Sequence, residues 1–194
     1  MRQVILDVET KKTFDEVGGY FPDRLGISFV GVCVREGFTG GGELQGFFEE
    51  ELEHLFPVLE QADVIVGFNL EQFDMQTFIP YYGGDVDKLP TLDLMLRIKD
   101  SVGHRIGLDA VARETLGFGK TGDGLDAIKY FKSGQLDKLK EYCLQDVKVT
   151  RDIYDHGLKK GQVKFRNKWN RLIEAPVDFS FIPQQNVGVQ MSLI

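Results

Sequence analysis

The segment from Gln3 to Thr10 is an apolar run that ends in two carboxylates, Asp7 and Glu9, separated by one residue. An apolar run of this length predicts a buried β-strand, and successive side chains of a strand point to opposite faces. Asp7 and Glu9 therefore share one face of the predicted strand. Two anions that face the same way repel unless a cation or a proton lies between them. The pair is either half of a metal site or the polar end of a strand that enters a turn.

The pattern that follows predicts a mixed α/β sheet. Two further strands, over residues 25–34 and 43–48, are linked closely enough to form an antiparallel meander with the first. Residues 49–61 carry apolar side chains at helical spacing and lead into an apolar strand at 63–68. A helix between two strands is the crossover that a parallel pair needs. Residues 91–98 are predicted as a fifth strand, although Leu94, Met95 and Leu96 would also suit a helix. We therefore expect three antiparallel strands and then two parallel ones, flanked by helices.

The chain is long enough for one domain with a sizeable core. We expect an α/β domain over residues 1–160 and a C-terminal basic hairpin and tail over residues 161–194. The remaining predicted elements are helices at 73–82, 107–116, 125–131 and 136–158, a loop at 117–124, and hairpin strands at 163–166 and 172–179.

The net charge of −7 argues against broad nonspecific binding to nucleic acid, because phosphates are neutralised by Lys and Arg. The segment 159–171 is the exception, since it holds six basic residues, no acidic one, and two interleaved aromatic rings. Such a segment can follow phosphates and stack on bases. Lys164, Arg166 and Lys168 are therefore candidate substrate-binding residues, and the alternative is a solvated basic turn.

The two cysteines, Cys33 and Cys143, lie in apolar contexts without metal-ligand spacing. They are predicted to be small core residues in a reducing compartment. The apolar run before Asp7 is too short for a signal peptide, and no run reaches membrane-spanning length. We expect a cytoplasmic protein with no membrane partner.

A third carboxylate, Asp74, follows the predicted strand at 63–68 and ends the sequence Asn69-Leu70-Glu71-Gln72-Phe73-Asp74. In an open α/β sheet, residues beyond the carboxyl ends of adjacent parallel strands converge on one crevice. Asp74 can therefore meet Asp7. The alternative role for Asp74 is a helix N-cap, which Asp commonly provides.

Tyr142 and Asp146 stand four residues apart in the long predicted helix, so they share a helix face. This face adjoins the apolar stripe of the helix. A carboxylate next to an apolar stripe needs a partner, because burying an unpaired charge is costly. A metal ion shared with Asp7 and Glu9 would be one. The alternative is a surface Asp146 flanked by lysines.

These three sequence patterns resemble the three motifs of the DEDD 3′→5′ exonucleases of the ribonuclease-H-like superfamily. The Asn69–Asp74 spacing is most similar to the proofreading domains of family-B DNA polymerases and to stand-alone bacterial relatives. Tyr142 indicates the tyrosine subtype, because Glu141 stands where the histidine subtype has His. The resemblance covers residues 3–154 and includes a similar helix at 107–112.

The resemblance implies a ribonuclease-H-like fold and a site for two Mg²⁺ or Mn²⁺ ions, which suit oxygen ligands. It implies that Asp7 bridges both ions and that Tyr142 orients the attacking water. Glu9 and Asp146 would complete the first metal site, and Asp74 would support the second.

The expected activity is hydrolysis at the 3′ end of single-stranded DNA or RNA, with Asn69 and the backbone near Thr10 as further substrate contacts. A structure-specific endonuclease is an alternative, since related sites use similar carboxylates. So is a noncatalytic nucleic-acid-binding or docking module of a helicase or polymerase. The intact set of carboxylates argues against a noncatalytic module, because a site without catalytic activity has no physical reason to keep four mutually repelling anions.

Overall fold

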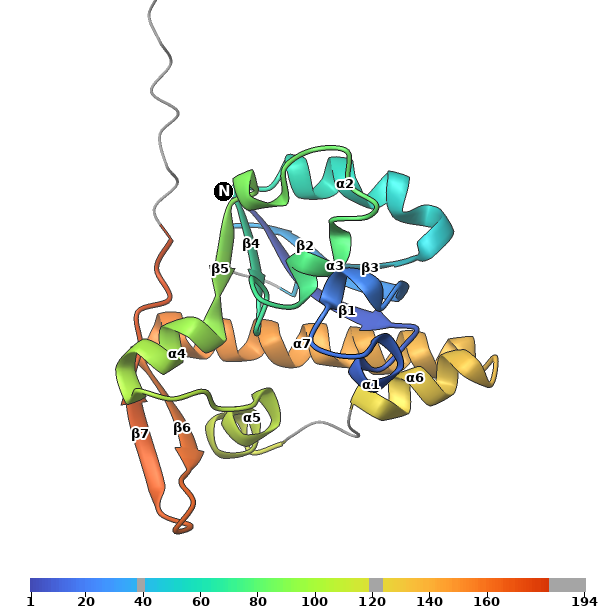
Figure 1. The fold of residues 1–194 in the computed structure, drawn as a ribbon. Helices are drawn as coiled ribbons and strands as arrows, with labels where there is room; N and C mark the ends of the chain where they lie inside the picture. The colour runs from blue at the N-terminus through green and yellow to red at the C-terminus, as the bar shows by residue number, and fades with distance from the viewer. Residues whose placement is uncertain (38–40, 119–123, 182–194) are drawn as a thin grey trace, which may run out of the picture.

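A mixed five-stranded sheet forms the centre of the molecule (Figure 1). The computed structural model describes residues 1–37, 41–118 and 124–181. The strand order is β3-β2-β1-β4-β5, with antiparallel pairing among the first three strands and parallel pairing of β1 with β4 and of β4 with β5. This confirms the predicted fold class. The strands are β1 (Arg2–Thr10), β2 (Ile27–Glu36), β3 (Glu43–Phe48), β4 (Val64–Gly67) and β5 (Thr91–Asp93).

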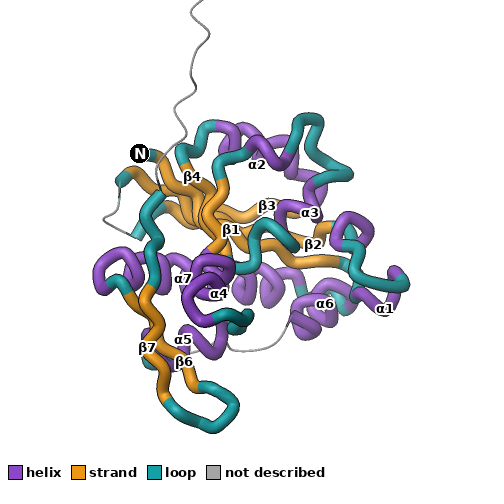
Figure 2. The backbone as a smooth tube through the Cα atoms, turned by 60° about the vertical axis from the view of Figure 1, so that its left-hand side comes forward, coloured by secondary structure: helices purple, strands orange, loops and turns teal. Residues whose placement is uncertain are grey.

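Helices cover both faces of this sheet (Figure 2). The long helix α7 packs on β1 and β2 on one face, and α2 and α3 lie on the other. No helix within the described ranges is both long and apolar enough to cross a bilayer. The α-helices are α1 (Phe14–Val17), α2 (Leu52–Glu60), α3 (Asp74–Phe78), α4 (Leu94–Val102), α5 (Leu108–Leu116), α6 (Gly124–Lys132) and α7 (Leu136–Lys160).

The prediction of a strand over 91–98 is wrong beyond Asp93. Strand β5 has three residues, and Leu94 begins the helix α4. The Asp93 side chain accepts hydrogen bonds from the backbone N–H groups of Met95 and Leu96, at 2.9 and 3.3 Å. This is an N-cap, which ends the strand and starts the helix at one residue. The predicted helix at 73–82 is also shorter than expected, and α1 was not predicted.

Helix α7 presents the predicted apolar stripe to the sheet. Its side chains at Leu139, Cys143 and Val147 are completely buried, and the stripe continues to Tyr154. Leu136, which the pattern included in the stripe, is the first residue of the helix and is 41% exposed. The loop predicted over 117–124 lies largely outside the described residues, and Gly124 already belongs to α6.

The predicted C-terminal hairpin is present as β6 (Gln162–Arg166) and β7 (Leu172–Pro176). It projects from the side of the molecule opposite to α1 and α6 (Figure 1). Its base is fixed to α5, because the Thr115 hydroxyl accepts from the Lys164 N–H at 2.8 Å and donates to the Lys164 carbonyl at 3.0 Å. Phe165 and Phe179 belong to the same apolar cluster as the parallel half of the sheet.

Gly157 in α7 leaves the space that the ring of Phe179 fills. We expect Gly157→Ala to destabilise the fold by about 1–2 kcal/mol, because overpacking against a buried ring outweighs the higher helix propensity of alanine. Urea unfolding measures the change. Gly83→Ala is the control, since a Cβ at Gly83 would meet open space. An unchanged or higher stability of the Gly157 variant would show that Phe179 relaxes without cost.

Candidate functional site

The site lies where β1 and β4 separate. The two strands are paired only from Gln3 to Ile5 and from Val64 to Val66, and β4 ends at Gly67. Strand β1 continues to Thr10, paired with β2 alone. A crevice therefore opens on the β4 side of the last five residues of β1, as expected beyond the carboxyl ends of parallel strands.

Asp7 and Glu9 lie on this last part of β1 and close to one another. Ligand atoms of Asp7, Glu9 and Cys143 all lie within 4.8 Å of one another. The Cys143 thiol donates to the Asp7 side chain at 3.6 Å and to its main-chain carbonyl at 3.5 Å. The sequence pattern did not indicate Cys143 as part of the site, because its place depends on α7 crossing β1.

Asp74, the first residue of α3, reaches back across the crevice to β1. Its Oδ1 accepts a hydrogen bond from the Val8 N–H at 2.9 Å, and its side chain is buried. Burial, followed by the nearby charge of Asp7, raises the pKa of Asp74 well above its ordinary value. Asp74 therefore interacts electrostatically with Asp7 across the crevice.

Asp93 holds the loop that carries Asp74. Its carboxylate accepts from the N–H groups of Asn69 at 3.0 Å and Glu71 at 3.2 Å, in addition to capping α4. Asn69 has φ of 68°, a left-handed conformation that Asn tolerates better than most residues. Burial raises the pKa of Asp93. Asp93 was not predicted as a site residue, although an Asp between a short strand and a helix is a recognisable cap signal.

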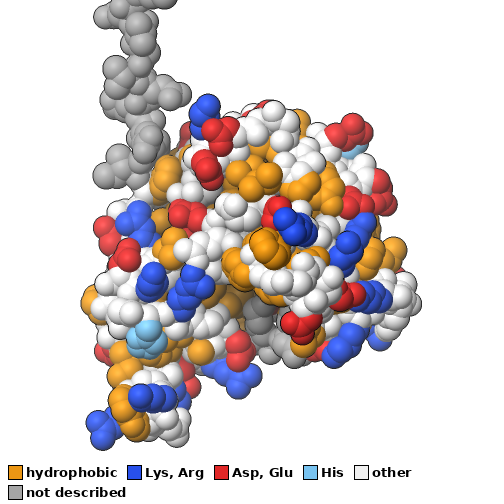
Figure 3. Space-filling view, viewed as in Figure 1, with side chains coloured by type: hydrophobic (Ala, Val, Ile, Leu, Met, Phe, Trp, Pro, Cys, Tyr) orange, Lys and Arg blue, Asp and Glu red, His pale blue; other side chains and the backbone are white. Residues whose placement is uncertain are grey.

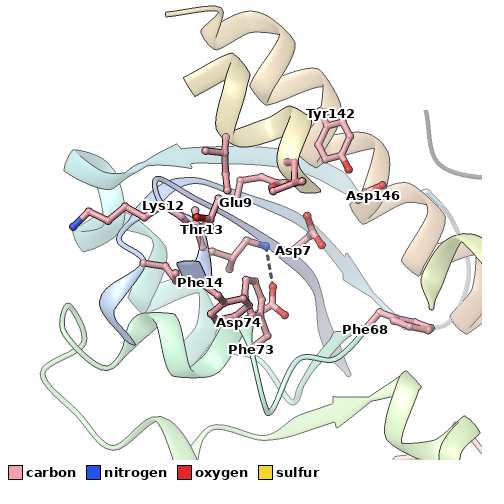
Figure 4. Close-up of a pocket in the computed structure, with 15 residues that line it drawn as sticks. Asp7, Glu9, Lys12, Thr13, Phe14, Phe68, Phe73, Asp74, Tyr142 and Asp146 are labelled. Carbon is pink, nitrogen blue, oxygen red and sulfur yellow. Dashed lines mark hydrogen bonds between the residues drawn. The ribbon is translucent and has the colours of Figure 1, made fainter. Parts of the chain in front are cut away.

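Tyr142 and Asp146 enter the site from α7, and both are buried. Burial, and then the charges of Asp7, Glu9 and Asp146, raise the pKa of the Cys143 thiol well above its usual range. Asp146 thus faces the same point as the β1 carboxylates. Figure 4 shows Asp7 between Asp146 on one side and Asp74 on the other, with Tyr142 above Asp146.

These side chains line a cavity of about 360 Å³. Its walls are partly aromatic, with Phe14, Phe68 and Phe73 around the carboxylates (Figure 4). Lys12 also lines it. None of these four residues was predicted, because they come from two separate segments, at 12–14 and 68–73, with no shared spacing. The lining residues are Asp7, Val8, Glu9, Thr10, Lys12, Thr13, Phe14, Leu25, Phe68, Phe73, Asp74, Leu125, Ile128, Tyr142 and Asp146.

The short helix α1 holds one aromatic wall in place. Thr13 and Glu16 form a reciprocal capping box at its start. The ring of Phe14 stacks on Tyr20 with centroids 4.6 Å apart and meets the edge of Phe73 at 6.0 Å. The Tyr20 hydroxyl donates to the Gln72 carbonyl at 2.9 Å, which ties α1 to the loop before α3.

The remaining predicted substrate contacts lie at different distances from this cavity. Thr10 lines it, whereas Asn69 lies behind it against Asp93. Lys164 and Arg166 are on the hairpin, where they pair with Glu174 at 2.6 Å and Glu114 at 2.9 Å. Lys168 lies over the ring of Trp169 at the hairpin tip. The structure therefore groups the carboxylates and Tyr142 but separates them from the basic segment.

The chemistry of the donors suits a hard divalent cation. Four carboxylates face one cavity. Burial and then the charge of Asp7 raise the pKa of Asp74, and a bound cation would relieve both effects. Oxygen ligands of this kind prefer Mg²⁺ or Mn²⁺ to softer metals. The carboxylates of the cavity thus fit the predicted binding of Mg²⁺ or Mn²⁺.

Binding of Mg²⁺ or Mn²⁺ is expected to raise the melting temperature by roughly 5–10 °C at a hundredfold excess over Kd. The raised pKa means that folded Asp74 binds its proton more tightly than the unfolded chain does. Stability of the metal-free protein therefore falls as pH rises from the ordinary carboxyl pKa through the raised one. Calorimetry at several pH values should show a metal-induced shift that grows with pH. A shift of equal size at every pH would contradict this assignment.

Comparison with known proteins identifies the superfamily to which this fold belongs. The ribonuclease H superfamily model RNase_H_2 matches residues 4–157. No curated protein matches the chain. The family B DNA polymerase from the hyperthermophilic archaeon Pyrobaculum calidifontis has a similar fold, with a TM-score of 0.61 and 21% identity over 81% of this chain.

The aligned part is 24% of that polymerase, so this chain corresponds to less than two thirds of its length. E. coli Exonuclease I in complex with a 5cy-dT13 oligonucleotide aligns with a TM-score of 0.48 and 13% identity, over 82% of this chain and 41% of that one. The family model covers most of the residues described above, including all three segments that carry the carboxylates. The chain therefore belongs to the ribonuclease H superfamily.

Proposed function

We propose that this protein is a metal-dependent 3′→5′ exonuclease of the DEDD type, tyrosine subtype. The observation that carries the proposal is the convergence of Asp7, Glu9, Asp74, Asp146 and Tyr142 on one cavity. They come from three segments far apart in the sequence, and the spacing of each segment is that of an exonuclease motif.

Membership of the ribonuclease H superfamily supports a nuclease-type hydrolase that acts on nucleic acid. The likeness to a family B polymerase supports the fold alone, because the identity is 21%. The proposal of 3′→5′ exonuclease activity therefore depends on the motif resemblance and on the carboxylates and aromatic rings that line the cavity.

The carboxylates would hold two divalent cations, which supply an activated water at neutral pH and stabilise the leaving oxygen. Asp7 would contribute to both sites, and its position between Asp74 and Asp146 supports this role (Figure 4). Tyr142 is one helical turn before Asp146 and lines the same cavity, so its hydroxyl would orient the attacking water. The hydrogen bond from the Val8 N–H fixes the Oδ1 atom of Asp74, whose side chain lines the cavity.

The aromatic walls favour an unpaired end as substrate. Phe14, Phe68 and Phe73 offer ring faces on which bases stack without sequence preference. A base in a duplex is already stacked and paired, so entering this cavity would cost its unpairing. Lys12 at the rim can approach a phosphate of the entering strand.

The test is digestion of 5′-labelled single-stranded DNA and RNA with Mg²⁺, Mn²⁺ or EDTA. We expect a ladder that shortens from the 3′ end in either metal and none in EDTA. Internal cuts would favour a structure-specific endonuclease. Complete survival of both polymers in all metals would favour a noncatalytic module of a helicase or polymerase and would end the exonuclease proposal.

A further inference from the structure

The tip of the β6–β7 hairpin exposes an aromatic ring among cations. Trp169 is 70% exposed, and the Lys168 ammonium lies 4.5 Å from its ring centroid. Leu172, the first residue of β7, is 47% exposed, and Arg171 before it is also exposed. Side chains as large as tryptophan are usually buried, so such exposure on a polar turn indicates a contact surface.

This tip is held in one conformation. The Asn167 side chain accepts hydrogen bonds from the Trp169 N–H at 3.0 Å and the Arg171 N–H at 3.1 Å. The Arg166 guanidinium donates to the Asn170 carbonyl at 3.1 Å. The ring of Trp169 is therefore presented on a structured turn, which lowers the entropy cost of binding.

The charges of the hairpin divide into two groups. Lys164 and Arg166 are neutralised by Glu174 and Glu114. Lys168 contacts an uncharged ring and keeps its charge. Figure 3 shows Lys and Arg side chains beside apolar ones at this tip, and others between the hairpin and the centre of the same face.

The loop between α4 and α5 connects the hairpin with the rim of the cavity. The Arg105 guanidinium donates to the Gln72 side chain, next to Phe73 of the cavity wall. Its neighbour His104 meets the ring of Phe165 in β6 edge-on, with centroids 6.2 Å apart. Because Gln72 is an uncharged partner, Arg105 keeps its charge for a phosphate. The loop therefore contacts both the segment beside the cavity wall and β6 of the hairpin.

We propose that the hairpin tip is a second binding site for single-stranded nucleic acid, apart from the catalytic cavity. The strand whose 3′ end lies in the cavity passes Arg105 and stacks a base on Trp169, while Lys168 and Arg171 contact its phosphates. Cations beside an aromatic platform are the combination that binds unpaired strands without sequence preference. The site rests on the proposed function for the position of the 3′ end, and it predicts that long strands bind more tightly than short ones.

Trp169 is the only tryptophan of the chain, so its fluorescence reports on this site alone. Oligothymidylates of about 4 and about 20 nucleotides lie below and above common single-strand site sizes. In EDTA, the long strand should quench the fluorescence and the short one should not. Trp169→Ala should weaken binding of the long strand roughly tenfold, as expected for one lost base stack, and Trp169→Phe should restore most of it.

The charged part of the site is tested by salt dependence. Replacing Lys168 and Arg171 by Gln should reduce the slope of log K against log salt by about 1.4, for two phosphate contacts on a single strand. Lys88→Gln is the control for charge, since Lys88 is exposed on a distant 3-10 turn. It should leave affinity for the long strand unchanged.

Fluorescence quenching tests the second binding site, and hydrolysis tests the exonuclease activity, so the two proposals can fail independently. Wild-type protein that degrades the short strand but shows no quenching by the long one would overturn the second site and keep the nuclease. Fluorescence that changes with protein concentration without oligonucleotide would assign the tip to a second copy of the chain and overturn the proposal. Quenching by the long strand with no hydrolysis of either would support the second site and remove the exonuclease.

Discussion

Asp7→Ala is expected to lower nuclease activity by at least about 10³-fold, because the carboxylate shared by the proposed metal sites supplies several kcal/mol of transition-state stabilisation. The fold should persist. Asp7 is only half-buried, and its charge contributes to the raised pKa of Asp74, so removing it relieves repulsion. Single-turnover hydrolysis of labelled DNA measures the loss, and thermal unfolding measures the stability.

Asp100→Ala is the matched control for Asp7, since Asp100 is an exposed acidic residue of α4 outside the cavity. It should leave the rate unchanged. An Asp7→Ala protein that unfolds at the wild-type temperature and retains more than a tenth of the rate would remove Asp7 from the chemistry. The geometry in which Asp7 lies between Asp74 and Asp146 would then need another explanation.

Asp93→Ala is expected to destabilise the fold by about 3 kcal/mol and to lower the rate about 10²-fold. The stability loss combines a missing helix cap with backbone N–H groups of Asn69 and Glu71 left without their acceptor. The rate falls because the loop that carries Asp74 shifts, and misplacement by about 1 Å can cost this factor. Denaturant unfolding and single-turnover kinetics measure the two effects.

Two variants separate positioning from general destabilisation. Asp93→Asn keeps one side-chain acceptor and should recover part of the rate. Asp85 caps the 3-10 turn at 86–88 through the Asp87 N–H at 3.1 Å, away from the cavity. Asp85→Ala should therefore lose some stability and keep the rate. A rate loss in Asp93→Ala no larger than in Asp85→Ala would reduce Asp93 to a purely structural cap.

Most of the sheet could be predicted because its signals are local. The apolar runs of β1, β2 and β4 predict strands without any knowledge of the tertiary structure. The helix before β4 is the crossover connection that leads into a parallel strand. The run from Leu94 to Leu96 was ambiguous, since Leu and Met suit either a strand or a helix. The hydrogen bonds of Asp93 decided it, and they depend on a single side chain rather than on periodicity.

The cavity walls could not be predicted. Neither could the hydrogen bonds by which Asp93 holds the loop at Asn69 and Glu71, in addition to capping α4. Phe14, Phe68 and Phe73 have no shared spacing, and Phe14 depends on a four-residue helix that is too short for a periodic signal. Cys143 was predicted to be buried and is buried. Its contact with Asp7 depends on the crossing of α7 over β1, which no pattern within α7 specifies.

The sequence by itself determined strands β1 to β4, the order of the carboxylates and the placement of Tyr142 and Asp146 on one helix face, because these follow from local patterns with periods of two and 3.6 residues. Only the tertiary structure decided that the carboxylates share one cavity, which residues form its walls, and that the basic hairpin lies away from it. Those relations join segments more than 60 residues apart, as the Val8–Asp74 hydrogen bond does. They depend on packing between whole elements, and a periodic pattern records only which face of each element is buried.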